Sequence, residues 1–267
     1  MKRTLCLCSI LSTLLLFFLS SPAGYAQFSD GVSGLLSMPS AEMHRDGTFT
    51  ITNNFLNKHQ LSDRRWGYNT FSYSFGITFW SRLEIGYVLT ILDGKRSPKP
   101  NPIFFNQDRH FNAKFLLLRE GEFGQDWVPA LAVGVSDPVT GASTGNYWGS
   151  QVDGGSTGYG NGYFNRYFVV SAKHFNTGIG SIGAHLGYQF SYRRDRPMNG
   201  PCAAVTWRPV WIQNDWVALN LIAEYDARTI NVGFITSIWK DHFEAMFELQ
   251  DLKWITAGLR YKLVLKH

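Results

Sequence analysis

Several acidic residues of the chain fall in pairs, and paired carboxylates are the groups that glycoside hydrolysis uses. Glu244 and Glu248 share one face of an expected strand, but four strand residues separate them by about 13 Å, which is too far for either stereochemical mechanism. Glu224 and Asp226 are closer, at about 7 Å, yet nothing near them in the sequence marks one of the two as a general acid of raised pKa. The carboxylate spacing therefore does not favour a glycosidase.

A serine hydrolase would need a nucleophile, a histidine and an orienting polar residue. His185 with Ser181 or Ser191 supplies these residue types, but no nucleophile-elbow sequence surrounds either serine. No metal-binding spacing connects the other histidines that we considered, which are single residues on expected loops or strand ends: His44, His59, His110 and His174. We therefore expect no catalytic residue, no cofactor and no metal ion.

The elements that carry these polar residues are expected to be long β-strands. In GSIGAHLGYQFSY (180–192) apolar residues alternate with small or polar ones, and successive side chains of a strand point to opposite faces. The same alternation begins at Thr48 and recurs almost to the end of the chain. It predicts strands at 48–56, 68–80, 82–92, 111–119, 127–136, 163–175, 180–192, 200–209, 217–226, 230–239, 242–250 and 254–265.

Two environments suit strands with one apolar and one polar face. One is a soluble sandwich with a dry core, and the other is a membrane barrel whose apolar face meets lipid. The predicted strands are nine to thirteen residues long. Strands of soluble proteins centre near five or six residues, whereas a tilted strand needs roughly nine to eleven to span a bilayer. Strand length therefore favours lipid.

The connections and the tryptophans favour a barrel as well. Long connections after the first, third, fifth and seventh predicted strands alternate with tight ones after the second, sixth and tenth, as in outer-membrane barrels. Interfacial belts of aromatic residues are also typical of these barrels. Seven tryptophans lie close to predicted strand ends: Trp66, Trp80, Trp127, Trp211, Trp216, Trp239 and Trp254. We expect an all-β fold, a transmembrane antiparallel up-and-down β-barrel of about 12 strands.

The N-terminus has the features of a secretory signal peptide. Lys2 and Arg3 precede the apolar run 11–19, and small residues follow as far as Ala26, where we expect cleavage. A transmembrane helix is the alternative, but the run is short and is followed by a proline and a glycine. No later window is apolar for the length that a spanning helix needs.

Cysteine content and charge exclude further classes of protein. After cleavage Cys202 is the single cysteine, so neither an intramolecular disulfide nor a paired-thiolate metal site can form. Loss of Lys2 and Arg3 lowers the formal net charge from +5 to +3, and the basic residues form no run. We therefore expect no nucleic-acid partner.

Charged and polar side chains on the predicted inward faces form a polar track. They can solvate the bore and neutralise one another across neighbouring strands, or they can guide a hydrophilic ligand such as a glycan. The residues are Arg82, Glu84, Lys114, His185, Gln189, Arg208, Glu224, Asp226, Glu244, Glu248 and Arg260.

The predicted loop 137–164 is rich in glycine, serine, threonine, asparagine and tyrosine. It can be a mobile external loop, or it can face a carbohydrate, because aromatic rings stack on sugar faces. The aromatic residues of this loop that could do so are Tyr147, Trp148, Tyr159 and Tyr163.

The lead-in GVSGLLSMPSAEMHRDGTFTI resembles the N-terminal signature of the YjbH family, in which Gly-x-x-Gly-Leu, a Pro-x-Ala step and Asp-Gly precede a first barrel strand. The matching residues are Gly31, Gly34, Leu35, Pro39, Ala41, Asp46 and Gly47. The segment EYDARTINVGF (224–234) is similar to a strand-turn-strand step of the same family. The resemblance implies a Gram-negative outer-membrane protein of exopolysaccharide secretion or assembly. Family members are longer and have more than one barrel-like region, whereas this chain has room for one barrel.

These observations predict three segments: a signal peptide at 1–26, an irregular plug or periplasmic collar at 27–47, and an outer-membrane barrel at 48–267. We expect a non-enzymatic protein that assists export, assembly or surface display of an exopolysaccharide. The expected partners are outer-membrane lipid, an exopolysaccharide and periplasmic export components. The alternatives are a passive pore or structural barrel without a glycan partner, and an embedded lipid or glycan hydrolase.

Overall fold

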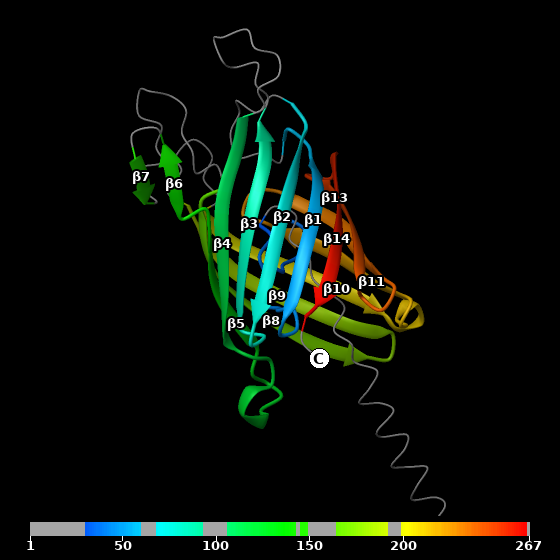
Figure 1. The fold of residues 1–267 in the computed structure, drawn as a ribbon. Helices are drawn as coiled ribbons and strands as arrows, with labels where there is room; N and C mark the ends of the chain where they lie inside the picture. The colour runs from blue at the N-terminus through cyan, green and yellow to red at the C-terminus, as the bar shows by residue number, and fades with distance from the viewer. Residues whose placement is uncertain are drawn as a thin grey trace, which may run out of the picture.

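The computed structural model describes residues 30–59, 68–92, 106–142, 145–148, 164–191 and 199–265. Within these ranges the fold is all-β: twelve antiparallel strands close into one barrel, and two short strands form a separate hairpin (Figure 1). The helical structure of the same ranges includes two single 3-10 turns, at Glu122–Gly124 and Val210–Ile212. None of the helices in the described part of the chain has the length and apolar character needed to cross a membrane.

The barrel strands follow one another around the sheet in chain order. They are β1 (Thr48–Leu56), β2 (Thr70–Phe79), β3 (Leu83–Leu92), β4 (Asn106–Leu118), β5 (Ala130–Ser136), β8 (Arg166–Thr177), β9 (Gly180–Phe190), β10 (Gly200–Pro209), β11 (Val217–Tyr225), β12 (Ile230–Ile238), β13 (Phe243–Gln250) and β14 (Trp254–Val264). β1 pairs with β14 from Thr48 opposite Val264 to Phe55 opposite Ala257, so the sheet has no free edge. The prediction of an up-and-down barrel of about 12 strands is confirmed.

Two details differ from the sequence prediction. β4 begins at Asn106 and not at 111, because its first residues are polar and hide the apolar alternation, although β3 still pairs with them as far as Leu92 opposite Asn106. The predicted loop 137–164 contains a hairpin of β6 (Val139–Ala142) and β7 (Gly145–Trp148), whose strands are too short to show a period. Every other strand boundary lies within three residues of its predicted position.

The period-two pattern places most large apolar side chains outside the barrel and most charged and polar side chains inside it. On β2, Phe71, Tyr73 and Phe75 are exposed, whereas the alternating Ser72 and Ser74 are buried. This arrangement is the reverse of a soluble sandwich, in which the apolar face is the buried one. The exposed face is broad, because each of the twelve barrel strands carries at least one exposed large apolar side chain.

The two ends of the barrel differ in their connections. The turn end carries the connections 80–82, 119–129, 178–179, 210–216 and 239–242, and the loop end carries the connections that follow β1, β3, β5, β9, β11 and β13. Most of the exposed tryptophans of the described residues lie in connections at the turn end: Trp80, Trp127, Trp211, Trp216 and Trp239. Trp254 lies at the loop end, and Trp66 is outside the described residues.

The interior of the barrel holds the segment 30–47, which we call the inner segment (dark blue in Figure 1). Leu35, Leu36 and Met38 of this segment are completely buried. They form one cluster with apolar residues on the inward faces of the strands, among them Leu116, Phe168, Val170, Ile222, Ile235 and Met246. The main apolar core of the described residues therefore lies between the inner segment and the barrel wall.

Candidate functional site

The candidate site is the barrel interior, where charged side chains of the wall hold the inner segment. Glu84 on β3 and Lys114 on β4 are register partners, and Lys114 Nζ lies 3.3 Å from Glu84 Oε2. Lys114 Nζ also donates to the backbone carbonyls of Ser33 and Glu42, each at 2.6 Å. The Glu84 carboxylate accepts hydrogen bonds from the backbone N–H groups of Ser33, at 2.7 Å, and His44, at 2.8 Å.

A buried ion pair is costly unless its remaining donors and acceptors are satisfied. Both Glu84 and Lys114 are buried, and the backbone of the inner segment supplies the missing hydrogen bonds on either side of the pair. The ion pair and the inner segment thus stabilise each other. Without the segment, Lys114 and Glu84 would need water or another hydrophilic ligand in its place.

The tip of the inner segment wraps around a second carboxylate. Leu35 N–H donates to the Met38 carbonyl at 2.9 Å, which closes a tight turn. The backbone N–H groups of Leu36, Ser37 and Met38 then donate to Glu224 on β11, at 3.0, 2.7 and 3.0 Å. Successive N–H groups that converge on one anion make a favourable binding concavity. Glu224 is therefore the anchor of the tip.

Two further charged groups hold the same turn. Ser37 Oγ donates to Glu248 on β13 at 2.8 Å, and Arg166 on β8 donates to the Ser37 carbonyl at 3.1 Å. Arg166 also forms a buried ion pair with Asp30 near the start of the described segment. Side chains from β8, β11 and β13 thus converge on three consecutive residues of the tip, 36–38.

A pair of glycines lets the inner segment lie flat against β2 and β3. Gly76 and Gly86 are register partners on these strands. A Cβ atom on Gly76 would lie 2.2 Å from the Gly31 carbonyl oxygen, and one on Gly86 would lie 2.6 Å from the Asp30 carbonyl oxygen. Backbone atoms of the segment occupy the space that side chains would need, so these two positions require glycine.

Most residues of the predicted polar track lie on the inward face, but the inner segment separates them into groups. Glu84 and Lys114 form one group with the segment, and Glu224, Glu248 and Gln189 lie around its tip and Arg166. Glu244 lies 3.7 Å from Arg260 and 2.9 Å from Lys262. Arg208 contacts Glu42, and His185 contacts Thr206.

Two residues of the predicted track, Arg82 and Asp226, lie in connections between strands and stabilise those connections. Arg82 lies in the turn before β3, which begins only at Leu83, and its guanidinium pairs with Glu122 in the next connection of the turn end. Asp226 is buried just after β11 and accepts the backbone N–H groups of Arg228 and Thr229, at 3.0 and 2.8 Å.

The predicted glycan-facing residues are largely outside the described part of the chain. Tyr147 and Trp148 belong to β7, but their side chains are not among the described ones. Tyr159 and Tyr163 lie outside the described residues altogether. Their contact with a carbohydrate stays a prediction.

The sequence prediction missed the residues of the inner segment that contact the wall, and it missed Arg166. No period marks Asp30, Ser33 or Glu42, so no pattern in the lead-in identified them as partners of the strands. The sequence did contain a signal that His174 and His185 would lie close together. The two-residue connection 178–179 fixes the register of β8 and β9, in which His174 is opposite Gly183 and Ala172 is opposite His185.

Two groups of side chains in the described residues have the donor types and proximity of a metal site. One is Glu42, His174 and His185, and the other is Asp108, His110 and Asp137; within each group the donor atoms lie within 4.8 Å of one another. Sequence spacing predicted no metal site, because each group joins separate parts of the chain.

Glu120, in the connection between β4 and β5, supports the first of these groups from the turn end. Partial burial raises the pKa of the Glu120 carboxyl, but hydrogen bonds from the ring and backbone of His174 lower it more strongly, to about 2. The Glu120 side chain is therefore a carboxylate at neutral pH.

The anchoring of the tip predicts that Glu224→Gln loosens the inner segment. An amide presents an N–H₂ group to backbone donors, and loss of charge-assisted hydrogen bonds costs roughly 1.5–3 kcal/mol. We expect amide hydrogen exchange at Leu36, Ser37 and Met38 to become about 10–100-fold faster, measured by mass spectrometry on the folded protein. Asp251→Asn, at an exposed carboxylate of the loop end, is the matched control. Unchanged protection of the tip in Glu224→Gln would contradict its role as anchor.

Comparison with protein-family models gives one match. The model of the YjbH family, described as exopolysaccharide biosynthesis protein YbjH, matches residues 26–264. No curated protein matches the chain. The matched region contains the inner segment and all twelve barrel strands. Because the match covers nearly the whole sequence, the chain belongs to the YjbH family of exopolysaccharide biosynthesis proteins.

Proposed function

We propose that this protein is a non-enzymatic outer-membrane barrel of a Gram-negative bacterium that assists export, assembly or surface display of an exopolysaccharide. The family supports the link to exopolysaccharide biosynthesis. In this proposal residues 1–26 are a cleaved signal peptide, and the inner segment is a plug that closes the barrel. The observation that carries the proposal is a closed barrel with an apolar exterior whose hydrophilic bore is filled by a segment of its own chain.

The outer face supports the assignment to a membrane. Hydrocarbon offers no hydrogen-bond partner to the backbone, so a sheet can lie in it only when closed on itself. The exposed large apolar residues of this barrel include Phe75, Phe111, Leu186, Val205 and Leu259. Soluble monomers rarely expose apolar patches of more than a few hundred Å². The tryptophans of the turn end match the aromatic girdle at one membrane interface.

Leu186→Arg tests this assignment. Leu186 is 65% exposed in the middle of β9, and an arginine at the bilayer midplane destabilises a barrel by about 2–4 kcal/mol. We expect a loss of that size in the free energy of unfolding in lipid vesicles, measured by denaturant titration. Leu252→Arg makes the same change in the connection between β13 and β14 and should have little effect. Equal stability of the two variants would show that the β9 face does not contact lipid.

The filled bore favours a gated export function over a passive open pore. The wall groups that hold the plug are carboxylates, a lysine and an arginine: Glu84, Lys114, Arg166, Glu224 and Glu248. These groups can also bind the hydroxyl groups of a glycan once the plug has left. Mixed signs along the bore suit a neutral or weakly charged polymer better than a selective ion path.

Conductance in planar bilayers distinguishes a closed from an open barrel. The wild-type mature protein should show little steady conductance, because buried side chains of residues 30–44 occupy the bore. Replacement of residues 30–44 by a glycine-serine segment of equal length should open a steady channel, since no barrel strand is removed. A wild-type channel as conductive as the replacement variant would favour the passive pore and count against a plug.

The exopolysaccharide role is tested in the bacterium that encodes the protein. Deletion of the gene should lower the amount of polysaccharide at the cell surface, and the wild-type gene should restore it. The same strain expressing Leu252→Arg should behave as wild type. Normal surface polysaccharide in the deletion strain, with the protein confirmed in the outer membrane of the parent, would favour a structural barrel without a glycan partner.

An embedded hydrolase is the remaining alternative. The ring of His185 contacts Thr206 Oγ1 at 3.3 Å, and Glu224 accepts four hydrogen bonds, three from the plug and one from Asn231. The four hydrogen bonds of Glu224 account for its burial without a catalytic role. Turnover of phospholipid or glycan by the purified protein, abolished by His185→Ala or Glu224→Ala, would favour the hydrolase.

A further inference from the structure

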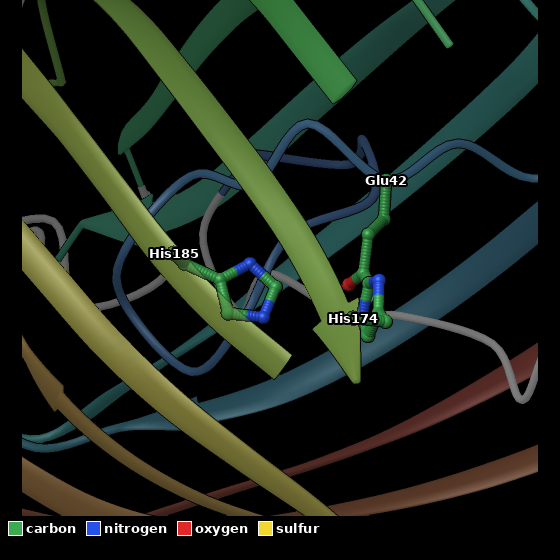
Figure 2. Close-up of side chains that lie close together, drawn as sticks. All are labelled: Glu42, His174 and His185. Carbon is green, nitrogen blue, oxygen red and sulfur yellow. The ribbon is translucent and has the colours of Figure 1, made fainter. Parts of the chain in front are cut away.

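Near the turn end, three side chains from separate parts of the chain converge on one point. Glu42 comes from the inner segment, His174 from β8 and His185 from β9 (Figure 2). Glu42 Oε1 lies 2.7 Å from His174 Nε2, and one donor atom of each residue lies within 4.8 Å of those of the other two. Two imidazoles and one carboxylate are a common ligand set for Zn²⁺.

The β8–β9 hairpin brings the two imidazoles together. His174 is opposite Gly183, and His185 follows two residues later on the same inward face. A Cβ atom at Gly183 would lie 2.9 Å from His185 Nε2 and 3.0 Å from His174 Cδ2. The missing side chain at position 183 therefore provides the space that both rings occupy.

A second set of contacts orients the ligands, as in known metal centres. His174 Nδ1 lies 2.7 Å from Glu120 Oε2, and this carboxylate also accepts the His174 backbone N–H at 2.8 Å. A histidine that binds a metal through one nitrogen usually donates its other ring N–H to a carboxylate or carbonyl. The Glu120 contact thus leaves His174 Nε2 to face Glu42.

One nitrogen of the His185 ring is not satisfied by hydrogen bonding among the described residues. His185 Nδ1 is buried with no hydrogen-bond partner there, whereas His174 Nε2 lies 2.7 Å from Glu42 Oε1. Buried polar atoms without partners are uncommon in folded proteins and call for an explanation. A metal ion bound to the His185 ring would account for the burial of this side chain with so few polar partners.

The charges around the three side chains are balanced before an ion binds. Arg208 donates to Glu42 Oε1 at 3.1 Å, and Lys173 lies 3.0 Å from Glu120. The carboxylates of Glu42 and Glu120 offset these two positive groups. A ligating carboxylate that accepts a further hydrogen bond, as Glu42 does from Arg208, is typical of the outer shell of a metal centre.

We propose that Glu42, His174 and His185 bind one divalent transition-metal ion of the Zn²⁺ class, with Glu120 positioning His174. Imidazole nitrogens favour zinc and related ions over Mg²⁺ and Ca²⁺, which take oxygen ligands. Because Glu42 belongs to the inner segment and both histidines belong to the wall, the bound ion ties the segment to the β8–β9 hairpin. This inference does not depend on the exopolysaccharide role.

Metal binding is tested on the full mature protein folded in detergent and freed of metal with a chelator. Calorimetric titration with ZnCl₂ should give one site per chain, and MgCl₂ should give none at the same concentrations. Glu42→Gln and His185→Gln should each weaken Zn²⁺ binding at least tenfold. Glu120→Gln should weaken it by about 10–100-fold without abolishing it, as expected for a residue that orients a ligand.

The matched control is His242→Gln, at a half-buried histidine of the turn end that contacts the Lys262 carbonyl. It should bind Zn²⁺ as the wild type does. Heat-modifiability on gels checks that each variant is a closed barrel, and Glu42 lies outside the barrel sheet, so its replacement leaves every strand pairing intact.

A second measurement tests whether the bound ion holds the inner segment against the barrel wall. Zn²⁺ should slow hydrogen exchange at amides of residues 40–44 in the wild type but not in Glu42→Gln. Three outcomes would overturn the proposal: no Zn²⁺ binding by the wild type at about 100 µM, unchanged binding in both Glu42→Gln and His185→Gln, or loss of binding in His110→Gln alone. The last outcome would place the ion at Asp108, His110 and Asp137 instead.

Discussion

Closure of the sheet is the constraint on which the rest of this structure depends. Once β1 pairs with β14, every strand has a neighbour on both sides, and each side chain must point either outward or into the bore. The alternation in the sequence then puts charged groups such as Glu84, Lys114 and Glu224 into a confined space away from bulk water. Their burial is favourable only if partners are present, and the inner segment supplies these partners from its backbone.

The inner segment is held by two kinds of interaction that act on different faces. Leu35, Leu36 and Met38 pack on apolar and small residues of the wall, which gives non-directional stabilisation. The carbonyl and N–H groups of the same stretch contact Arg166 and Glu224, which fixes its orientation. Irregular backbone buried in this way must find such partners, because it has no sheet or helix of its own.

Strand positions could be predicted from the sequence because alternation is a local property. GSIGAHLGYQFSY shows its two faces without reference to any other part of the chain, and the same holds for most strands. Contacts of the inner segment could not be predicted, since residues such as Glu42 and His174 are far apart in the sequence and come together only through the folded barrel. The polar track could be predicted in part. Alternation predicts that Glu224 and Glu248 point into the barrel, but it does not predict that Ser37 of the inner segment contacts both of them. Alternation is least reliable at strand ends: Arg82 lies one residue before β3 begins and therefore belongs to the turn and not to the barrel wall.

The place where the inner segment joins β1 determines how it can move. Gly47 has a φ of 70°, donates to the Thr78 carbonyl and accepts the N–H of Leu265, so the junction is fixed beside the seam between the first and last strands. Among the described residues, none of the pairings of the barrel strands involves residues 30–44, and the bridge between Gly34 and Pro39 is internal to the segment. In the gated barrel that we propose, residues 30–44 leave the bore while the junction at Gly47 keeps them attached beside β1, so that the opened barrel retains every strand pairing and the same segment can close it again.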